Sequence, residues 1–226
     1  MKSTNKLDAL LHPKPIELPA RTSILLDKMY PTIPWKEVTS YNGLPWFMSK
    51  TSAIGTAQPS HFIKTRLGIY FKDFEGLSPN SQKSVLIHEA YHIQQYYDLK
   101  TSLDWGFYNK FMRLYFAWNL QLFFESFFIK RIDWKAAQRH AYRQHPMEIA
   151  AYDHEANFYA QINHFNAHEV GVFLRQFPRL IVQQAQPIER PNLFFYGLGT
   201  LITLMIAISR PVIESILIVV AKVTRI

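Results

Sequence analysis

Ser84–Gln95 reads SVLIHEAYHIQQ and holds the pattern HExxH at residues 88–92. Positions i and i+4 of an α-helix lie on one face about one turn apart, so His88 and His92 are both able to bind one Zn²⁺ ion. Glu89 lies one step round the helix from His88, where a carboxylate suits a general base that takes a proton from metal-activated water. The pattern therefore predicts His88 and His92 as metal ligands and Glu89 as a catalytic residue.

The residues before this pattern predict where its helix begins. Ser78 followed by Pro79 is typical of an N-cap with proline at the first helical position, and Ser81 is a second candidate cap. The helix is expected to run from about Pro79 to Tyr97, after a strand over Leu67–Phe71. The alternative interpretation is a solvated His-Glu-His face on a surface helix.

A catalytic zinc site of this type takes a third protein ligand and keeps its fourth position for water. The segment His145–Glu155, HPMEIAAYDHE, offers Glu148 on a second predicted helix, with two small alanines beside it that permit close helix packing. Glu148 is therefore the predicted third ligand of a site with one Zn²⁺ per chain. The rival ligands are His145, His154 and Asp153. His145 precedes a proline and is expected outside the helix, and the other two point to other faces of it.

Two further residues follow Glu148 at helical spacings. Tyr152 and Glu155 are predicted to share its face. Tyr152 is a predicted catalytic residue that donates its hydroxyl to a developing oxyanion, and Glu155 is predicted to orient a histidine ring. A structural tyrosine and a solvated glutamate are the alternatives. Gln95 falls on the metal-bearing face, where the alternatives are fixing a ligand tautomer, contacting substrate, or being an ordinary surface glutamine.

Several segments carry a resemblance to a known family, in the order Trp35–Val38 (WKEV), Gly43–Phe47 (GLPWF), Ala53-Ile54, Ile69–Phe71, Leu86–Gln95 and His145–Tyr152. The chain resembles bacterial HExxH metallopeptidases of a domain-of-unknown-function family, among which are domains associated with extracellular contractile injection systems. The usual pattern there is HELVHVxQ followed by an NPxExxAY-like segment, a gluzincin-like arrangement within the zincins. The resemblance covers roughly residues 30 to 160 and rests on the paired motifs.

This resemblance implies His88, His92 and Glu148 as metal ligands and Glu89 as the catalytic base. Two departures stand in the motifs: Ala90-Tyr91 replaces the common Leu-Val, and His145 stands where asparagine is frequent. The apolar tail after residue 191 lies outside the resemblance, so membrane attachment is not implied by it.

The composition of the chain restricts its metal chemistry and its partners. The chain has 226 residues, of which 48% are hydrophobic, enough to bury one core. It has no cysteine, which excludes a disulfide framework, an Fe–S cluster and cysteine-bound zinc, so a metal has to be held by His, Asp or Glu. The net charge of +8 is scattered along the chain without a recognition motif, and no nucleic-acid partner is expected.

Three regions are predicted along the chain: a proline-punctuated lead-in over 1–30, a zincin-like metallopeptidase domain over 31–185, and an apolar helical tail over 191–226. Asn42-Gly43 predicts a hairpin turn and Leu67–Phe71 an edge strand, which together indicate a small antiparallel sheet. Further helices are expected over 102–131, 134–144, 146–165 and 169–184, the first of them more often core than lipid-facing. The predicted fold class is α+β, with a helical core after the sheet and an apolar helical segment at the end.

The carboxyl-terminal tail is strongly apolar. Residues 191–209 hold no charged residue, close to the roughly 20 residues that span a bilayer. After Arg210-Pro211 a second apolar stretch, 212–221, is too short to cross alone and carries Glu214, so a helical hairpin or an interfacial segment fits as well as a second span. Membrane association through 191–222 is expected, with a pair of buried helices as the alternative. No secretory signal is visible at the amino terminus, so a cytoplasmic location is expected, membrane-associated through this segment.

The motifs together predict a zinc-dependent metallopeptidase that hydrolyses peptide bonds of a peptide or protein substrate with metal-activated water. An edge strand such as Leu67–Phe71 would align an extended peptide. The alternative is a non-catalytic membrane-associated protein in which a structural or vestigial metal site staples two helices. An open coordination position in a cleft favours the first, and a fourth protein ligand such as His145 or Glu155 favours the second.

Overall fold

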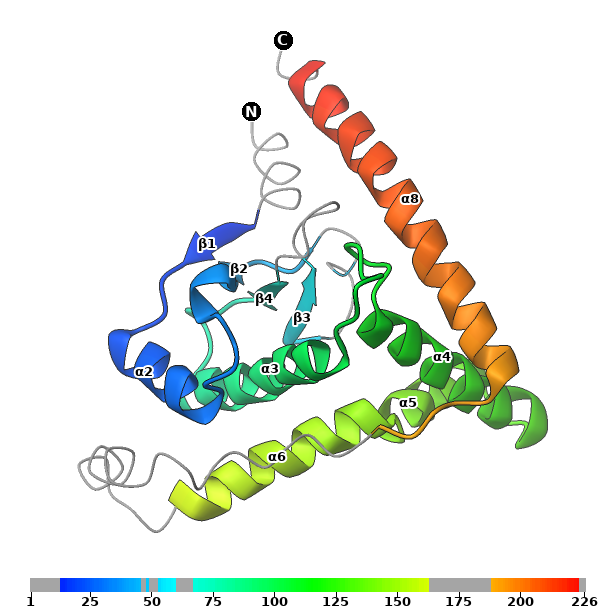
Figure 1. The fold of residues 1–226 in the computed structure, drawn as a ribbon, viewed down its shortest axis with the longest axis horizontal. Coiled ribbons are helices and arrows are strands. Elements are labelled where there is room, and N and C mark those ends of the chain that lie inside the picture. The colour runs from blue at the N-terminus through cyan, green and yellow to red at the C-terminus, as the bar shows by residue number, and fades with distance from the viewer. Residues whose placement is uncertain (1–12, 46–47, 49–52, 60–66, 163–187, 224–226) are drawn as a thin grey trace.

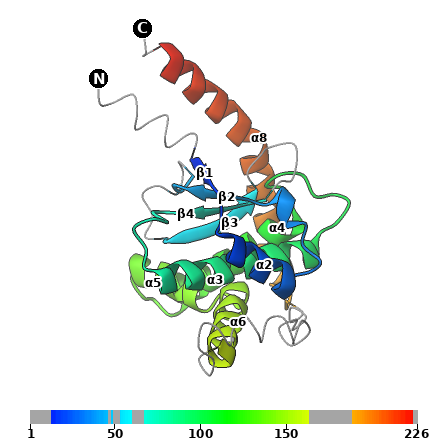
Figure 2. The same ribbon diagram turned by 90° about the vertical axis from the view of Figure 1, so that its left-hand side faces the viewer.

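The structure is a computed structural model that describes residues 13–45, 48, 53–59, 67–162 and 188–223. Its fold is α+β, as predicted. A small sheet lies on one side of the long helix α3 (Pro79–Leu99), and the helix α6 (Pro146–Ile162) lies on the other side (Figures 1 and 2). Because α3 is covered on both sides, its residues 86–93 are all buried. The central helix of the molecule is thus the one that carries HExxH.

The sheet has four strands in the order β1-β2-β4-β3, where β1 is Lys14–Ile16, β2 is Thr39–Asn42, β3 is Gly55–Pro59 and β4 is Leu67–Phe71. The β1–β2 and β3–β4 pairs are antiparallel, but β2 and β4 run parallel, with Thr39 opposite Gly68. The predicted antiparallel sheet is therefore a mixed sheet.

Two local predictions in the sheet are wrong. Gly43 has a φ of 114°, which fits the turn signal, but no hairpin follows, because the next strand, β3, pairs with β4 and not with β2. Strand β4 is central rather than an edge strand, and all five of its residues are buried, as its near-continuous apolar sequence fits. The edge strand that contacts α3 is β3.

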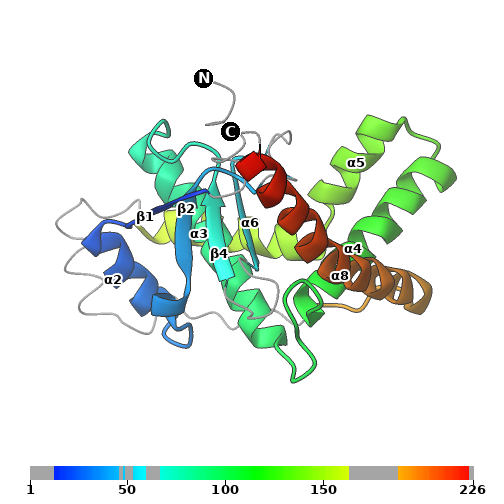
Figure 3. The same ribbon diagram turned by 90° about the horizontal axis from the view of Figure 1, so that it is seen from above.

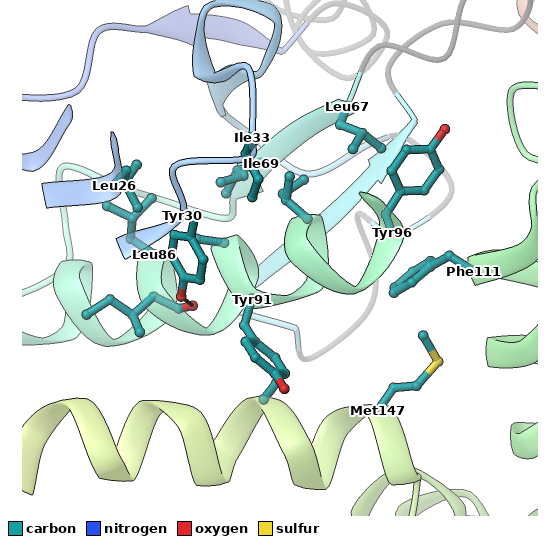
Figure 4. Close-up of a cluster of buried hydrophobic side chains, with 14 of the residues drawn as sticks. Leu26, Tyr30, Ile33, Leu67, Ile69, Leu86, Tyr91, Tyr96, Phe111 and Met147 are labelled. Atoms are coloured by element: carbon teal, nitrogen blue, oxygen red, sulfur yellow. Dashed lines mark hydrogen bonds between the residues drawn. The ribbon is translucent and has the colours of Figure 1, made fainter. Parts of the chain in front are cut away.

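The hydrophobic core lies on both sides of α3, with Met147 of α6 on one side and the sheet on the other (Figure 4). Buried side chains from α2 (Ala20–Met29), from β4 and from α3 meet there, among them Leu26, Ile69 and Leu86. A short 3₁₀ helix, η1 (Trp35–Glu37), precedes β2. Each fully buried aliphatic side chain stabilises the fold by roughly 1.5–3 kcal/mol, so this cluster fixes α3 against the sheet.

The start of α3 is confirmed in detail. The hydroxyl oxygen of Ser78 accepts a hydrogen bond from the Ser81 backbone N–H at 3.2 Å, and Pro79 is the first helical residue. The helix ends at Leu99, slightly beyond the predicted Tyr97. A cap of this kind satisfies a backbone donor that the first turn leaves unpaired, which stabilises the helix that holds the motif.

The aromatic segment 102–131 is helical only in part. Helix α4 (Lys110–Phe124) is capped by Asn109, whose side chain accepts from the Met112 N–H at 2.8 Å, and it continues as a π-helical turn, η3 (Glu125–Ile129). Before the cap, Gly106 has a φ of 49°, outside the right-handed helical region, which explains why the helix begins later than predicted.

The next two helices begin where the sequence predicts. Helix α5 (Trp134–Arg143) is capped by Asp133, which accepts from the Ala136 N–H at 3.0 Å, and α6 begins at Pro146. The segment predicted as a helix over 169–184 lies outside the described residues.

The apolar tail forms one continuous helix, α8 (Leu193–Val223), which passes through Pro211. The interpretation of 212–221 as the second arm of a helical hairpin is therefore wrong, because Pro211 removes one backbone donor without ending the helix. Helix α8 packs against α4 (Figure 3), where a Cβ on Gly199 would lie only 2.7 Å from the Ala117 nitrogen. The pair of buried helices that was the alternative is also wrong.

One helix in the described part of the chain is long and apolar enough to cross a membrane. It covers Leu193–Ile213, has a mean hydropathy of 1.6 and is 22% buried. Length and composition alone carry this finding, and they do not distinguish a helix that crosses a bilayer from one that lies on it.

Candidate metal centre

His88 and His92 from α3 and Glu148 from α6 bring three ligand atoms together between the two helices. The two Nε2 atoms are 3.2 Å apart, His88 Nε2 is 3.3 Å from Glu148 Oε2, and His92 Nε2 is 3.6 Å from Glu148 Oε1. A tetrahedral Zn²⁺ with bonds of about 2.0–2.1 Å holds its donor atoms about 3.3–3.4 Å apart. The three predicted ligands therefore lie at separations that fit one metal ion, and all three are buried.

Gln95 fixes the tautomer of His92. Its amide nitrogen donates to the Met147 carbonyl at 3.1 Å, so its oxygen faces His92 Nδ1 at 2.8 Å. Nδ1 then carries the proton, and the neutral ring presents the lone pair of Nε2 to the cluster, as a metal ligand requires. With only 1% of its surface exposed, Gln95 is not an ordinary surface glutamine. These contacts fit the prediction that Gln95 fixes the tautomer of His92, and the ligand role of His92 stays a prediction.

Glu155 stands behind the other histidine. Its Oε2 lies 3.6 Å from His88 Nδ1, on the far side of the ring from the cluster, and its other oxygen is hydrogen-bonded by the Ser84 hydroxyl. His88 Nδ1 is buried and has no partner at hydrogen-bond length. Glu155 therefore lies where the sequence predicts an orienting carboxylate, close to the ring nitrogen that does not face the cluster.

Tyr115 on α4 is a contact that the sequence did not predict. Its hydroxyl donates to Glu148 Oε1 at 2.8 Å, and burial, followed by the charge of Glu148, raises the pKa of this phenol well above its usual value. A phenol that stays protonated is a permanent donor, so it orients the Glu148 carboxylate. Tyr115 is one of many aromatic residues in α4, and no spacing in the sequence marks it as different from the others.

His145 is not a ligand, and the structure shows what it does instead. Its Nδ1 accepts from the Met147 N–H at 3.2 Å, in the position of an N-cap for α6, and its Nε2 donates to the Tyr115 carbonyl at 3.0 Å. Both ring nitrogens are used, and burial lowers the pKa of His145 to about 4, which keeps the ring neutral. Asparagine is among the best N-cap residues, and His145 performs the same capping task here.

The remaining rival ligands also lie away from the cluster. His154 turns to the other side of α6, where its Nε2 lies 2.7 Å from the Tyr30 hydroxyl and its ring stacks on Tyr91. Burial lowers the pKa of His154 to about 4. Asp153 is exposed and lines the cleft described below without joining the three-residue cluster. The prediction that His154 points to another face is confirmed, whereas Asp153 lines the same cleft as the cluster.

The three residues of the cluster share an electrostatic environment that favours protonated histidines. Burial disfavours a charged imidazole, but the neighbouring Glu148, Glu155 and Glu89 outweigh burial and raise the pKa of His88 to about 9. Burial likewise disfavours ionised Glu148, yet the two histidines lower its pKa below the usual value. Because a metal binds the neutral imidazole and the carboxylate, protons and metal ions compete for this cluster.

Glu89 lies beside the cluster and against the edge strand. Burial raises its pKa, while the two histidines and a hydrogen bond from the backbone of Ala57 in β3 oppose that shift. A Cβ on Gly55 would lie 3.1 Å from Glu89 Oε1 and 2.5 Å from Val85 Cγ1. Glycine at this position therefore lets the edge strand approach the carboxylate closely, and the raised pKa suits a general base.

Tyr152 covers the outer side of His88. The two ring centroids are 4.4 Å apart, the tyrosine is 49% exposed, and its hydroxyl lies 3.2 Å from that of Tyr142. Both hydroxyls belong to the wall of the cleft. Tyr152 thus lies at the site as predicted, and its role as an oxyanion donor stays a prediction. Tyr142, on a different helix, was not predicted.

A cleft of about 1090 Å³ opens onto the cluster. Its floor contains the three ligands and Glu89, one wall is formed by β3, and the opposite wall is aromatic, with Phe107, Phe111 and Phe116. This volume lies just above the roughly 300–1,000 Å³ of typical small-molecule sites.

Comparison of the chain with protein-family models, with curated proteins and with solved structures finds no match. The family resemblance of the motifs therefore stays a prediction, and the geometry of the site carries the functional argument.

Proposed function

We propose that this chain is a zinc-dependent metallopeptidase that hydrolyses peptide bonds in a peptide or protein substrate. The observation that carries the proposal is the His88, His92 and Glu148 cluster at metal-binding separations on the floor of an open cleft. Two imidazoles and one carboxylate are a donor set typical of catalytic zinc. A bound Zn²⁺ would supply water activation near neutral pH and polarisation of a carbonyl group.

The other residues of the site have distinct tasks in this proposal. Glu89 takes a proton from the attacking water and delivers it to the leaving amine, and its raised pKa suits both transfers. Tyr152 donates its hydroxyl to the oxygen of the scissile carbonyl as negative charge develops there. Gln95 and Tyr115 hold His92 and Glu148 in the orientation that ligation needs.

Strand β3 is the element that would align the substrate. It has β4 as its neighbour on one side among the described strands, and it lines the cleft on the other. An extended peptide that pairs with this edge passes directly over Glu89, and the aromatic wall opposite favours an apolar side chain. The sequence predicted that Leu67–Phe71 aligns the substrate. Because that strand is central, we assign this role to the edge strand Gly55–Pro59.

The competing interpretation, a closed structural or vestigial metal site, needs a fourth protein ligand. Within the described parts of the chain, the cluster contains three such residues. Glu155 approaches His88 from the Nδ1 side, and His145 uses both of its ring nitrogens elsewhere. The arrangement therefore supports a site that keeps one coordination position for a reactant.

The proposal includes a location. The apolar exposed surface of α8 supports attachment of the enzyme to a membrane through residues 191–222, with the catalytic domain in the cytoplasm. The metal centre lies between α3 and α6, away from α8 in the fold, so attachment and catalysis are tested separately.

The first experiment measures zinc in the full-length protein by elemental analysis. We expect about one zinc per chain in the native protein and almost none in Glu148→Ala, because two histidines alone bind zinc weakly. Asp153→Ala is the matched control on the same helix and should keep its zinc. A native protein without zinc under metal-replete conditions would overturn the proposal.

The second experiment separates catalysis from a structural metal. Glu89→Gln should keep its zinc and lose cleavage of a quenched fluorescent peptide library by about 100-fold or more, since general-base catalysis contributes about 10²–10⁴-fold. Glu75→Gln, an exposed carboxylate elsewhere, should cleave like the native protein. Loss of zinc in Glu89→Gln would show that Glu89 is structural, and a zinc-loaded native protein that cleaves no peptide would favour the structural metal site.

A further inference from the structure

The end of the α4–α5 hairpin exposes apolar side chains that nothing in the described chain covers. Phe124, Phe128, Ile129 and Trp134 are 42%, 57%, 67% and 55% exposed. We call these four residues the hairpin tip. Globular proteins normally cover such a group of large apolar side chains, and an exposed cluster of this kind marks a contact surface.

The hairpin tip is continuous with the start of α8 through a row of aromatic rings. The ring centroid of Phe124 lies 4.8 Å from that of Phe128 and 5.7 Å from that of Phe195. The centroids of Phe195 and Phe194 are 5.3 Å apart. Phe194 is 70% exposed. The tip and the amino-terminal end of α8 therefore form one apolar surface, at the end of the molecule where α4 and α8 meet in Figure 1.

Helix α8 has two different sides. One side packs on the protein: Thr203 and Ala207 are buried there, and the Arg210 guanidinium lies 4.8 Å over the Phe107 ring. The opposite side is apolar and exposed along the whole helix, and we call it the outer stripe. Its members follow helical spacing, namely Phe194, Leu201, Met205, Ile208, Val212, Ile216 and Val219. The outer stripe thus begins at the hairpin tip.

Exposed cations flank this surface. Lys130, Arg131 and Lys135 follow directly on the hairpin tip, and all three are exposed. Between residues 130 and 143 the acidic residue is Asp133, whose carboxylate is occupied in capping α5. Arg131 also has a φ of 55°, a backbone conformation that residues other than glycine rarely adopt. Apolar residues bordered by cations match the acyl chains and phosphates of an anionic bilayer.

The contacts of α8 favour a helix that lies flat. If α8 crossed the bilayer while packed on α4, the ion pair of Arg113 with Asp104 on the α4 side would enter the hydrocarbon region, which is costly. If α8 left α4 to cross alone, Arg210 would lose its place over Phe107 and enter that region instead. A flat helix keeps both arginines on the protein and still buries the outer stripe.

We propose that α8 is a monotopic anchor. It lies in the interface of an anionic leaflet with its outer stripe among the acyl chains, and the hairpin tip inserts beside it while Lys130, Arg131 and Lys135 bind lipid phosphates. The inference rests on the proposed membrane attachment and is independent of the metal centre. It assigns the hairpin tip, outside residues 191–222, a role in membrane binding.

The first test measures flotation of the full-length protein with vesicles of phosphatidylcholine that contain 0 or 30 mol% phosphatidylglycerol. We expect stronger binding to the anionic vesicles, weakened by salt. Lys130→Gln combined with Lys135→Gln should weaken anionic binding about 25-fold, at about fivefold for each charge near the surface. Lys14→Gln combined with Lys36→Gln, two exposed lysines elsewhere, should bind like the native protein. Equal weakening by both pairs would overturn the role of the tip.

The second test measures how deep the outer stripe lies. The chain has no cysteine, so Leu201→Cys, Met205→Cys, Val212→Cys and Val219→Cys each give one site for a fluorophore, quenched by spin labels at shallow or deep positions of the acyl chain. A flat helix gives the same shallow depth at all four sites. A depth that increases toward the centre of the stripe would show that the helix spans the bilayer. Membrane attachment would then be supported, and the flat orientation would be overturned. No vesicle binding at all would overturn both.

Discussion

The two pairs of buried histidines in the described part of the chain have opposite electrostatics. His88 and His92 lie against Glu148, and the pKa of His88 is raised to about 9. His145 and His154 are equally buried but bond to a backbone carbonyl and a tyrosine hydroxyl, and burial lowers the pKa of each to about 4. Burial alone therefore lowers the pKa of a histidine, whereas carboxylates beside a buried histidine outweigh burial and raise it.

The opposite electrostatics of the two pairs predict that His88 and His92 bind the metal and that His145 and His154 do not. His88→Ala should reduce the zinc content from about one per chain to nearly none, since one histidine and one carboxylate remain. His154→Gln should keep the zinc, because its ring lies on the other side of α6. Elemental analysis of both purified variants is the measurement. Zinc retained in His88→Ala and lost in His154→Gln would contradict the assignment of His88, and not His154, as a ligand.

The comparison also predicts a dependence of stability on pH. His145 and His154 are neutral in the fold with pKa values of about 4, and the unfolded chain binds protons near pH 6.5. The free energy of unfolding should therefore fall between pH 6.5 and 4, by about 1.4 kcal/mol per pH unit for each histidine. Urea unfolding in detergent and chelator measures it, and His154→Gln should reduce the slope.

In the same chelator experiment, His88 should change the free energy of unfolding with pH in the opposite direction. Because the folded pKa of His88, about 9, exceeds its unfolded value, its stabilisation is present below pH 6.5 and is lost as the pH rises to 9. Glu148→Gln should remove most of that loss. A stability that rises steadily from pH 4 to 9 in chelator would contradict the opposite electrostatics of the two pairs.

A smaller effect is expected from the residue that fixes the tautomer of His92. Gln95→Ala should weaken zinc binding about 10–100-fold, the usual range for a lost partner of a ligand histidine. Gln94→Ala is the adjacent control, since Gln94 bonds Asp98 at the helix surface. Competition with a zinc chelator of known affinity measures both. Equal affinities for the two variants would remove Gln95 from the site.

The smallest effect concerns the capping histidine. His145→Ala should lower the free energy of unfolding by about 1 kcal/mol, because the first turn of α6 loses its cap. His145→Asn should recover most of that loss, since asparagine is able to accept the same Met147 N–H. Thermal unfolding of the zinc-free proteins is the readout. A ligand role would instead show as lost zinc in His145→Asn.

The local parts of the candidate metal centre follow from the sequence. His88, His92 and the Ser78 cap follow from spacings within one helix, and Glu148 follows from a second predicted helix with small alanines beside it. The structure brings the three residues His88, His92 and Glu148 together, and their role as ligands stays a prediction. Gln95 was also placed on the correct face. These inferences need only the period of the helix and the chemistry of the side chains.

The contacts that depend on tertiary packing were not accessible in this way. The order of the sheet depends on which strands meet over α3, so β4 was taken for the edge strand in place of β3. Tyr115 reaches Glu148 from a helix that is aromatic on all sides, where no residue stands out. The hairpin interpretation after Arg210-Pro211 rested on the low preference of proline for the interior of a helix. That preference does not show whether the residues on either side continue the helix through Pro211, as they do.

The position of HExxH within α3 has a consequence for motion. His88 and His92 lie in the middle of a helix that begins at Pro79 and ends at Leu99, more than a turn from either end. Fraying is confined to the ends of a helix, and amide hydrogens in the middle of a buried one exchange only through large openings. The backbone that carries the ligands should thus be among the slowest-exchanging of the chain, with the site ordered before substrate arrives.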